Sequence, residues 1–156
     1  MIVAIQRVSR AEVRVAGAVV GKIGRGLLLF VGVERGDGEA DAEVLVRKIA
    51  ALRIFPGRNP MDVSLKEVNG ACLVVSQFTL AGSLHKGNRP GFDRAEDPPR
   101  ARALYELFTE KLRAENLPVE TGQFAADMEV ELVNDGPVTF ILEARAGALV
   151  RSPVVS

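Results

Sequence analysis

The side chains that could do chemistry lie in three polar segments, the first of which is SQFT, residues 76–79. These residues follow an apolar run, so we expect them at the end of a buried strand, where side chains emerge into a cleft. Strand alternation would place Ser76 and Phe78 on one face and Gln77 and Thr79 on the other. Thr79 is the candidate nucleophile by residue type, but no general base stands beside it in the sequence. The plainer interpretation is a group of polar residues that only ends a strand.

The second segment, HKGNRPGF, lies in a polar stretch of roughly 19 residues, and loops of that length are usually functional. Its glycines let main-chain N–H groups approach an anion beside Lys86 and Arg89, so the segment is a candidate phosphate site. Three arginines add positive charge near an expected helix start: Arg94, Arg100 and Arg102. Charges that only meet solvent are the alternative. His85, the single histidine, is either a solvated loop residue or the base on which any Ser-His-Asp triad would depend.

The third segment, NDGP, joins two strand-like stretches, MEVELV and VTFIL. Asn134, Asp135 and Gly136 are typical of turns, so a hairpin turn is one interpretation. The other is that this turn is itself the site. An X-Pro peptide has a cis penalty of only about 0.5–1 kcal/mol, and a cis Gly136–Pro137 bond would aim carbonyls in directions that a trans bond forbids.

Composition excludes several classes of function. Lys plus Arg and Asp plus Glu each number 20, so no overall charge draws the chain onto nucleic acid or membrane, and any RNA contact must be local. No metal-ligand pattern is present, so we expect neither metal nor cofactor. Cys72 lies in an apolar run and is expected to be a buried small hydrophobe. The opening residues do not resemble a signal peptide and no apolar run approaches ~20 residues, so we expect a soluble cytoplasmic protein.

Strands and helices must position these segments. Period-two patterning predicts paired strands at 2–8 and 11–15, and a short strand between glycines follows. Residues 26–33 are apolar on both faces, as in a central buried strand. Helical spacing then predicts a helix within 35–55. Its apolar positions are Val44, Leu45, Ile49 and Leu52.

The second half of the chain predicts a further buried strand at 71–80, then a helix that opens at Asp97-Pro98-Pro99, then mostly strands. The apolar face of that helix holds Leu104, Leu107, Phe108 and Leu112. We therefore expect an α/β fold in one domain, residues 1–156, whose last few residues form a tail. Its sheets would be mixed, mostly antiparallel and barrel-like, flanked by two main helices.

Three segments taken together, LVVSQFTL, KGNRPGF and NDGPVTF, resemble the motifs of the D-aminoacyl-tRNA deacylase family. The opening QRVSRAEV and the stretches KIAALRIF, MDVSL and VETGQFAADM are also similar, in the family's order, over nearly the whole chain. The chain departs from the usual pattern at Asp62, Gly91 and Ala125, and the loop before Met61 is short.

The resemblance implies a homodimer with active sites at the subunit interface, where a cis Gly136–Pro137 pair enters the neighbouring subunit's pocket as a chiral filter. It implies hydrolysis of the ester bond of D-aminoacyl-tRNA, with L-aminoacyl-tRNA rejected and glycyl-tRNA mischarged on tRNA(Ala) accepted. The tRNA's terminal 2′-hydroxyl would assist. Catalysis would fall to Gln77, Phe78 and Thr79. Substrate binding is expected at Ser76, Gly136, Pro137, Arg7, Lys86 and Arg89, with Arg7 bracing the Gly-Pro pair.

Two other classes of function stay open. One is a module that binds RNA ends or nucleotides without catalysis, and the other is an interaction domain that uses the same strands for dimerisation. Net charge zero weighs against broad nucleic-acid binding, and we expect no DNA partner and no membrane.

Overall fold

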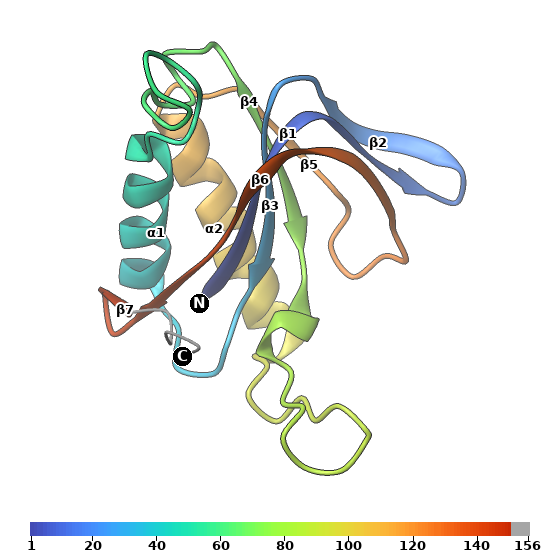
Figure 1. Cartoon of the computed structure of the whole chain (residues 1–156). Helices are drawn as coiled ribbons and strands as arrows, with labels where there is room; N and C mark the ends of the chain where they lie inside the picture. The colour runs from blue at the N-terminus through green and yellow to red at the C-terminus, as the bar shows by residue number, and fades with distance from the viewer. Residues whose placement is uncertain (151–156) are drawn as a thin grey trace.

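A computed structural model, which describes residues 1–150, contains one mixed seven-stranded sheet with two α-helices (Figure 1). Within the described residues the strand order is β5-β4-β3-β1-β6-β7, and β2 pairs with β1. The strands are β1 (Ile2–Val15), β2 (Ala18–Ile23), β3 (Gly26–Gly32), β4 (Ala71–Ser76), β5 (Val119–Thr121), β6 (Glu129–Arg145) and β7 (Ala148–Val150). The helices are α1 (Glu39–Ala51), α2 (Pro98–Ala114) and the short 3₁₀ helix η1 (Phe78–Ala81).

The expected α/β class is confirmed, as is the mostly antiparallel pairing of the sheet. Among residues 1–150, only β3 with β4 and β4 with β5 pair in parallel. In the described part of the chain the sheet does not close into a barrel, because β5 and β7 end the path of paired strands. The expected tail lies in residues 151–156, outside the described part of the chain.

The predicted pair of strands at 2–8 and 11–15 is wrong, because β1 is one continuous strand. Its pairing with β6 shifts register between Val8 and Arg10, and the residues at this bulge, Ser9 and Arg10, are exposed. The polar pair interrupts the strand pattern in the sequence, but in the structure it forms a bulge. Beyond a bulge of one extra residue, the alternate side chains that faced one side of the sheet face the other. Val3 and Ile5 belong to one core cluster, whereas Val8 before the bulge and Ala11 and Val13 beyond it belong to the other.

Of the two interpretations of NDGP, the hairpin turn is wrong, because β6 runs through the segment without reversing. Asn134 is paired with Val8 and Thr139 with Gln6, which leaves the four residues 135–138 opposite Arg7 alone. Those residues form a wide bulge, and the chain resumes its pairing with β1 on both sides. The turn-favouring residues here let the chain leave the pairing with β1 for four residues, and they do not reverse its direction.

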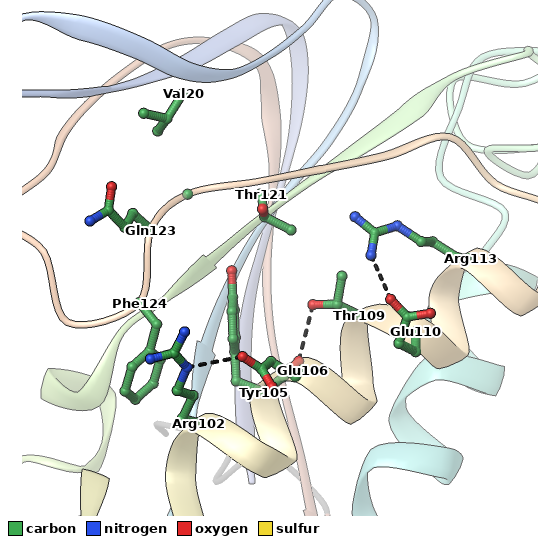
Figure 2. Close-up of a pocket in the computed structure, with 11 residues that line it drawn as sticks. Val20, Arg102, Tyr105, Glu106, Thr109, Glu110, Arg113, Thr121, Gln123 and Phe124 are labelled. Atoms are coloured by element: carbon green, nitrogen blue, oxygen red, sulfur yellow. Dashed lines mark hydrogen bonds and ion pairs between the residues drawn. The ribbon is translucent and has the colours of Figure 1, made fainter. Parts of the chain in front are cut away.

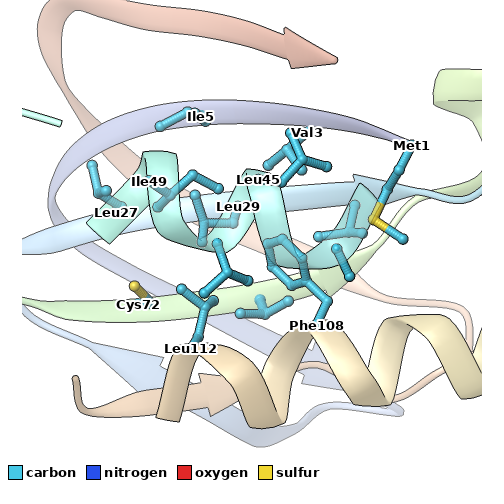
Figure 3. Close-up of a cluster of buried hydrophobic side chains, with 14 of the residues drawn as sticks. Met1, Val3, Ile5, Leu27, Leu29, Leu45, Ile49, Cys72, Phe108 and Leu112 are labelled. Carbon is cyan, nitrogen blue, oxygen red and sulfur yellow. The ribbon is translucent and has the colours of Figure 1, made fainter. Parts of the chain in front are cut away.

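The larger core cluster lies between the sheet and both helices (Figure 3). Leu45 and Ile49 of α1 and Phe108 and Leu112 of α2 are fully buried in it. Cys72 is buried with them, as expected, and burial raises its thiol pKa to about 12. Both helix predictions are confirmed, including the start of α2 after Asp97 with proline in its first turn.

The strand predicted at 71–80 stops early. β4 ends at Ser76, and η1 follows from Phe78. The strand-like letters SQFTL are thus divided between two conformations, and the face alternation expected for residues 76–79 does not hold. Among residues 1–150, no helix combines the length and apolar character needed to cross a membrane.

Candidate active site

A cleft of about 610 Å³ opens where the parallel strands β3 and β4 end. The carboxyl ends of neighbouring parallel strands lie at one edge of a sheet, which is where α/β proteins commonly bind ligands. We call it the main cleft. One end of the main cleft is lined by Ser76, Gln77 and Phe78. Another part, near the segment that leads to β6, is lined by Tyr105 of α2 and by Phe124.

Ser76, Gln77 and Phe78 are brought together in the main cleft, and the turn into η1 sets how they lie. The Gln77 main-chain N–H donates to Val31 O at 2.8 Å, which ties this corner to β3. The Gln77 side-chain amide donates to Thr79 Oγ1 at 2.5 Å. Thr79 is exposed and reaches the site through this bond, since it is not among the residues that line the cleft.

No acid–base partner accompanies the Thr79 hydroxyl. Within the described residues it is bonded by Gln77 and by no carboxylate or imidazole. His85 is exposed and makes no hydrogen bond in that part of the chain, so no Ser-His-Asp arrangement forms around it. The arrangement can position a substrate and offer dipoles, but it holds no side-chain base next to a nucleophile.

Two aromatic pairs mark the cleft. Phe78 and Phe92 pack with ring centroids 5.2 Å apart, and they are 60% and 39% exposed, so apolar rings face solvent at the mouth. Tyr105 and Phe124 pack at 5.8 Å, and the Tyr105 hydroxyl donates to Val74 O at 2.9 Å. The sequence prediction did not assign Phe92, Tyr105 or Phe124 to the site. Phe92 and Phe124 lie in the segments that resemble the family, KGNRPGF and VETGQFAADM, and this was the one signal in the sequence that could have assigned them to the site.

The Gly136–Pro137 peptide is cis, and both residues are exposed on the β6 bulge. Asn134 donates its amide to Arg7 O at 2.9 Å and to Val138 O at 3.2 Å, across the base of the bulge. In this single chain neither Gly136 nor Pro137 lines the main cleft. The structure therefore keeps the two halves of the expected site on different parts of the molecule.

Arg7 holds the bulge from beneath. It is only 5% exposed, and its Nη1 donates to Ile54 O at 2.6 Å and to Pro60 O at 3.3 Å. Its Nε lies 3.0 Å from Asp135 Oδ2, but the pair is not aligned as a hydrogen bond, so the contact is electrostatic. The buried cation thus links the bulge to the loop that follows α1.

Lys86 and Arg89 lie on the exposed segment 82–92, which extends away from the sheet (Figure 1). Ser83 and Gly91 close the segment by exchanging main-chain hydrogen bonds of 2.8 and 2.9 Å. No carboxylate of the described residues pairs with either cation, which leaves both able to meet an anion. The other three arginines differ, because each is paired. Arg94 contacts Glu34, Arg100 contacts Glu96 and Arg102 contacts Glu106.

Comparison with known proteins gives a consistent result. The family model described as D-Tyr-tRNA(Tyr) deacylase matches residues 4–143. A D-aminoacyl-tRNA deacylase of Anaeromyxobacter dehalogenans (strain 2CP-C) is 60% identical over 90% of this chain and 95% of its own length. One of Persephonella marina (strain DSM 14350 / EX-H1) is 54% identical over 94% and 99%. A solved structure, titled c-Myc DNA Unwinding Element Binding Protein, superposes with a TM-score of 0.87 at 38% identity, covering 94% of this chain and all of the other.

Proposed function

This chain belongs to the D-Tyr-tRNA(Tyr) deacylase family, and from that premise we propose that it hydrolyses the ester bond of D-aminoacyl-tRNA. The products are the free D-amino acid and the tRNA. The observation that carries the proposal is the end of β4, where polar groups and main-chain donors meet at the main cleft without a catalytic triad. An aminoacyl ester is already labile, so stabilising its transition state requires less of the protein than an amide would.

We assign oxyanion stabilisation to the main chain of Phe78 and Thr79. These residues open η1, and the first N–H groups of a helix have no acceptor within it. Donors fixed in this way stabilise a tetrahedral oxyanion without reorganising. Gln77 holds the Thr79 hydroxyl in place, which suits a positioning role for that hydroxyl. The attacking water then forms the new C–O bond as the bond to the ribose 3′-oxygen breaks, and the terminal ribose 2′-hydroxyl of the tRNA passes the proton of the water to that leaving oxygen.

We assign stereochemical selection to Gly136 and Pro137 of a second copy of the chain. Both are exposed on a bulge whose base is bridged by the Asn134 amide, yet they lie outside their own chain's cleft. Val133 and Phe140, on either side of them in β6, are each 42% exposed, as expected for an apolar surface that a partner covers. In such a homodimer, Gly136–Pro137 carbonyls would bond the substrate's α-amino group and leave no room for an L side chain.

Selection by exclusion also sets the substrate range. A D side chain points away from a main-chain filter, so its identity is unimportant, and glycine has no side chain to reject. Glycyl-tRNA mischarged on tRNA(Ala) would therefore be cleaved too. The role we propose is quality control of translation in the cytoplasm, with tRNA bound at its acceptor end by Ser76 in the cleft and by Lys86 and Arg89 outside it.

The name of the 38%-identical structural neighbour gives that protein a DNA element as partner. For this chain we propose no DNA partner. Its net charge is zero, and the arginines of the α2 region that could have formed a basic surface are paired with carboxylates. Duplex binding normally needs several unpaired cations on one surface.

The test is hydrolysis of matched D- and L-aminoacyl-tRNA under identical conditions. We expect release of the D-amino acid and of glycine, with the L-ester left at its spontaneous rate. A tRNA that ends in 2′-deoxyadenosine should bind and stay charged. Equal cleavage of D- and L-esters would contradict the filter, and full activity on the deoxy substrate would contradict the role of the 2′-hydroxyl.

A further inference from the structure

A second cavity, of about 390 Å³, lies behind the main cleft, between α2, β2 and residues 121–124 (Figure 2). We call it the α2 cavity. Its volume falls within the range of sites for small organic groups. Tyr105 and Phe124 line both this cavity and the main cleft, so one aromatic pair is the wall between them.

The proposed function fixes which end of the main cleft holds the ester. If the ester lies at Phe78 and Thr79, the terminal nucleoside extends along the cleft toward Tyr105 and Phe124. An RNA chain that leaves past that wall meets the α2 cavity, a solvent-exposed pocket on the other side of it. A single-stranded RNA end places its next base within reach of such a neighbouring pocket.

The chemistry of the α2 cavity fits a base better than a phosphate. Its two arginines already have carboxylate partners, Arg102 with Glu106 at 3.0 Å and Arg113 with Glu110 at 2.6 Å. The cavity therefore carries little net charge, whereas a phosphate site needs unpaired cations.

The polar groups without partners are a carboxamide and a hydroxyl. Within the described residues, neither the Gln123 amide nor the Thr121 hydroxyl makes a hydrogen bond, and both residues line the cavity. A carboxamide presents a donor and an acceptor side by side, as the pairing edge of a base requires. Arg102 lies over the Phe124 ring with its guanidinium 6.0 Å from the centroid, which adds a planar surface for stacking.

We propose that the α2 cavity binds the base of the penultimate nucleotide of the tRNA acceptor end, with Gln123 as its main hydrogen-bonding partner. This inference rests on the proposed function. The penultimate nucleotide of every mature tRNA is cytidine, and the exocyclic amine and ring nitrogen of cytosine match the acceptor and donor of a carboxamide. The contact would thus serve all tRNAs alike and carry no preference among them.

The experiment compares three substrates that carry the same D-amino acid: the full tRNA, the dinucleotide cytidylyl-adenosine, and adenosine alone. Gln123→Ala should raise KM about threefold to tenfold for the tRNA and the dinucleotide, the effect of one lost hydrogen bond, and leave KM for the aminoacyl-adenosine unchanged. Gln123→Glu, which keeps the size but loses the donor, should behave alike. Arg47→Ala, exposed on α1, is the matched surface control and should change none of the three.

An equal KM rise on all three substrates, or none on any, would overturn the proposal. Gln123 is exposed and makes no side-chain hydrogen bond within residues 1–150, so its replacement leaves the fold intact. Failure of the proposed function would show itself separately, because the unaltered protein would then hydrolyse none of the three esters.

Discussion

Replacing Arg7 by alanine tests whether a buried cation holds the β6 bulge in place. The guanidinium is 5% exposed and donates to Ile54 O at 2.6 Å and to Pro60 O at 3.3 Å. Hydrogen bonds from a charged donor contribute about 1.5–3 kcal/mol each, and the longer bond less. Asp135 is 43% exposed, so solvent screens its ion pair with Arg7 to about 1 kcal/mol or below. We expect a loss of roughly 3 kcal/mol in the free energy of unfolding.

Arg10→Ala is the matched control, because Arg10 lies on the same strand and also pairs across to β6. Its ion pair with Glu131 joins side chains that are 51% and 42% exposed. Such a surface pair contributes well under ~1 kcal/mol. Urea denaturation of the two variants beside the unaltered protein measures both losses. The Arg7 variant should also discriminate less between D- and L-esters, since the bulge keeps only its Asn134 anchor.

Equal destabilisation by the two substitutions would refute the structural part of this reasoning. An Arg7→Ala protein that unfolds at lower urea but keeps full D-over-L discrimination while folded would refute the functional part. Arg7→Lys separates charge from geometry, because lysine keeps the cation near Asp135 but cannot present a planar fork of donors. It should recover part of the stability and little of the discrimination.

Three further predictions concern the site. Thr79→Ala should slow turnover about tenfold without abolishing it, since it removes one hydrogen-bonded hydroxyl and no base; complete loss, or a trapped acyl-enzyme in the unaltered protein, would indicate covalent catalysis instead. Lys86→Ala should weaken tRNA binding and reduce the slope of log affinity against log salt by about 0.7–0.9, whereas Lys48→Ala on α1 should not; an unchanged slope would make Lys86 a solvated surface residue. Burial raises the pKa of Tyr105, the single tyrosine, to about 12, so ultraviolet titration should give a midpoint near 12 in the folded protein and near 10 in urea. Because the folded-state pKa is the higher, this stabilisation is complete below pH 10 and is lost as the pH rises through 12; a midpoint near 10 with native circular dichroism would contradict the burial.

Sequence patterns predicted the elements whose signals are local. Asp97 before two prolines marks the start of α2, because proline needs no N–H acceptor in the first turn of a helix. The run at 26–33 is apolar on both faces because β3 lies between β1 and β4 with core clusters on either side. For the start of α2 and for β3, residues close together in the sequence were enough to predict the element.

The errors arose where distant pairing overrides local preference. Asn134–Gly136 are good turn residues, and the polar pair Ser9–Arg10 interrupts the period-two pattern of the first strand. Here β1 and β6 pair with each other on both sides of both segments, so each segment forms a bulge and the chain does not reverse. Nothing within the two segments distinguishes a bulge from a turn.

The site shows the same division. Ser76, Gln77 and Phe78 could be placed in a cleft because they follow a buried strand in the sequence. Tyr105 and Phe124 could not, because their place depends on how α2 packs against β4 and on the path taken by the segment before β6. A tyrosine at helical spacing indicates only a core position, and here it is both a core residue and a wall of two cavities.

The β6 bulge links the fold to the proposed function. Residues 135–138 interrupt the pairing with β1 at Arg7, although the two strands stay paired on either side. The lost contacts are replaced by the Asn134 amide and by a buried arginine, whose desolvation makes it a costly support for a sheet. An unbroken ladder would have been more stable, so stability alone does not account for the bulge. The bulge is accounted for if Gly136 and Pro137 act outside their own chain. The main cleft of one chain is not lined by that chain's own Gly136 and Pro137, so a second copy would supply them.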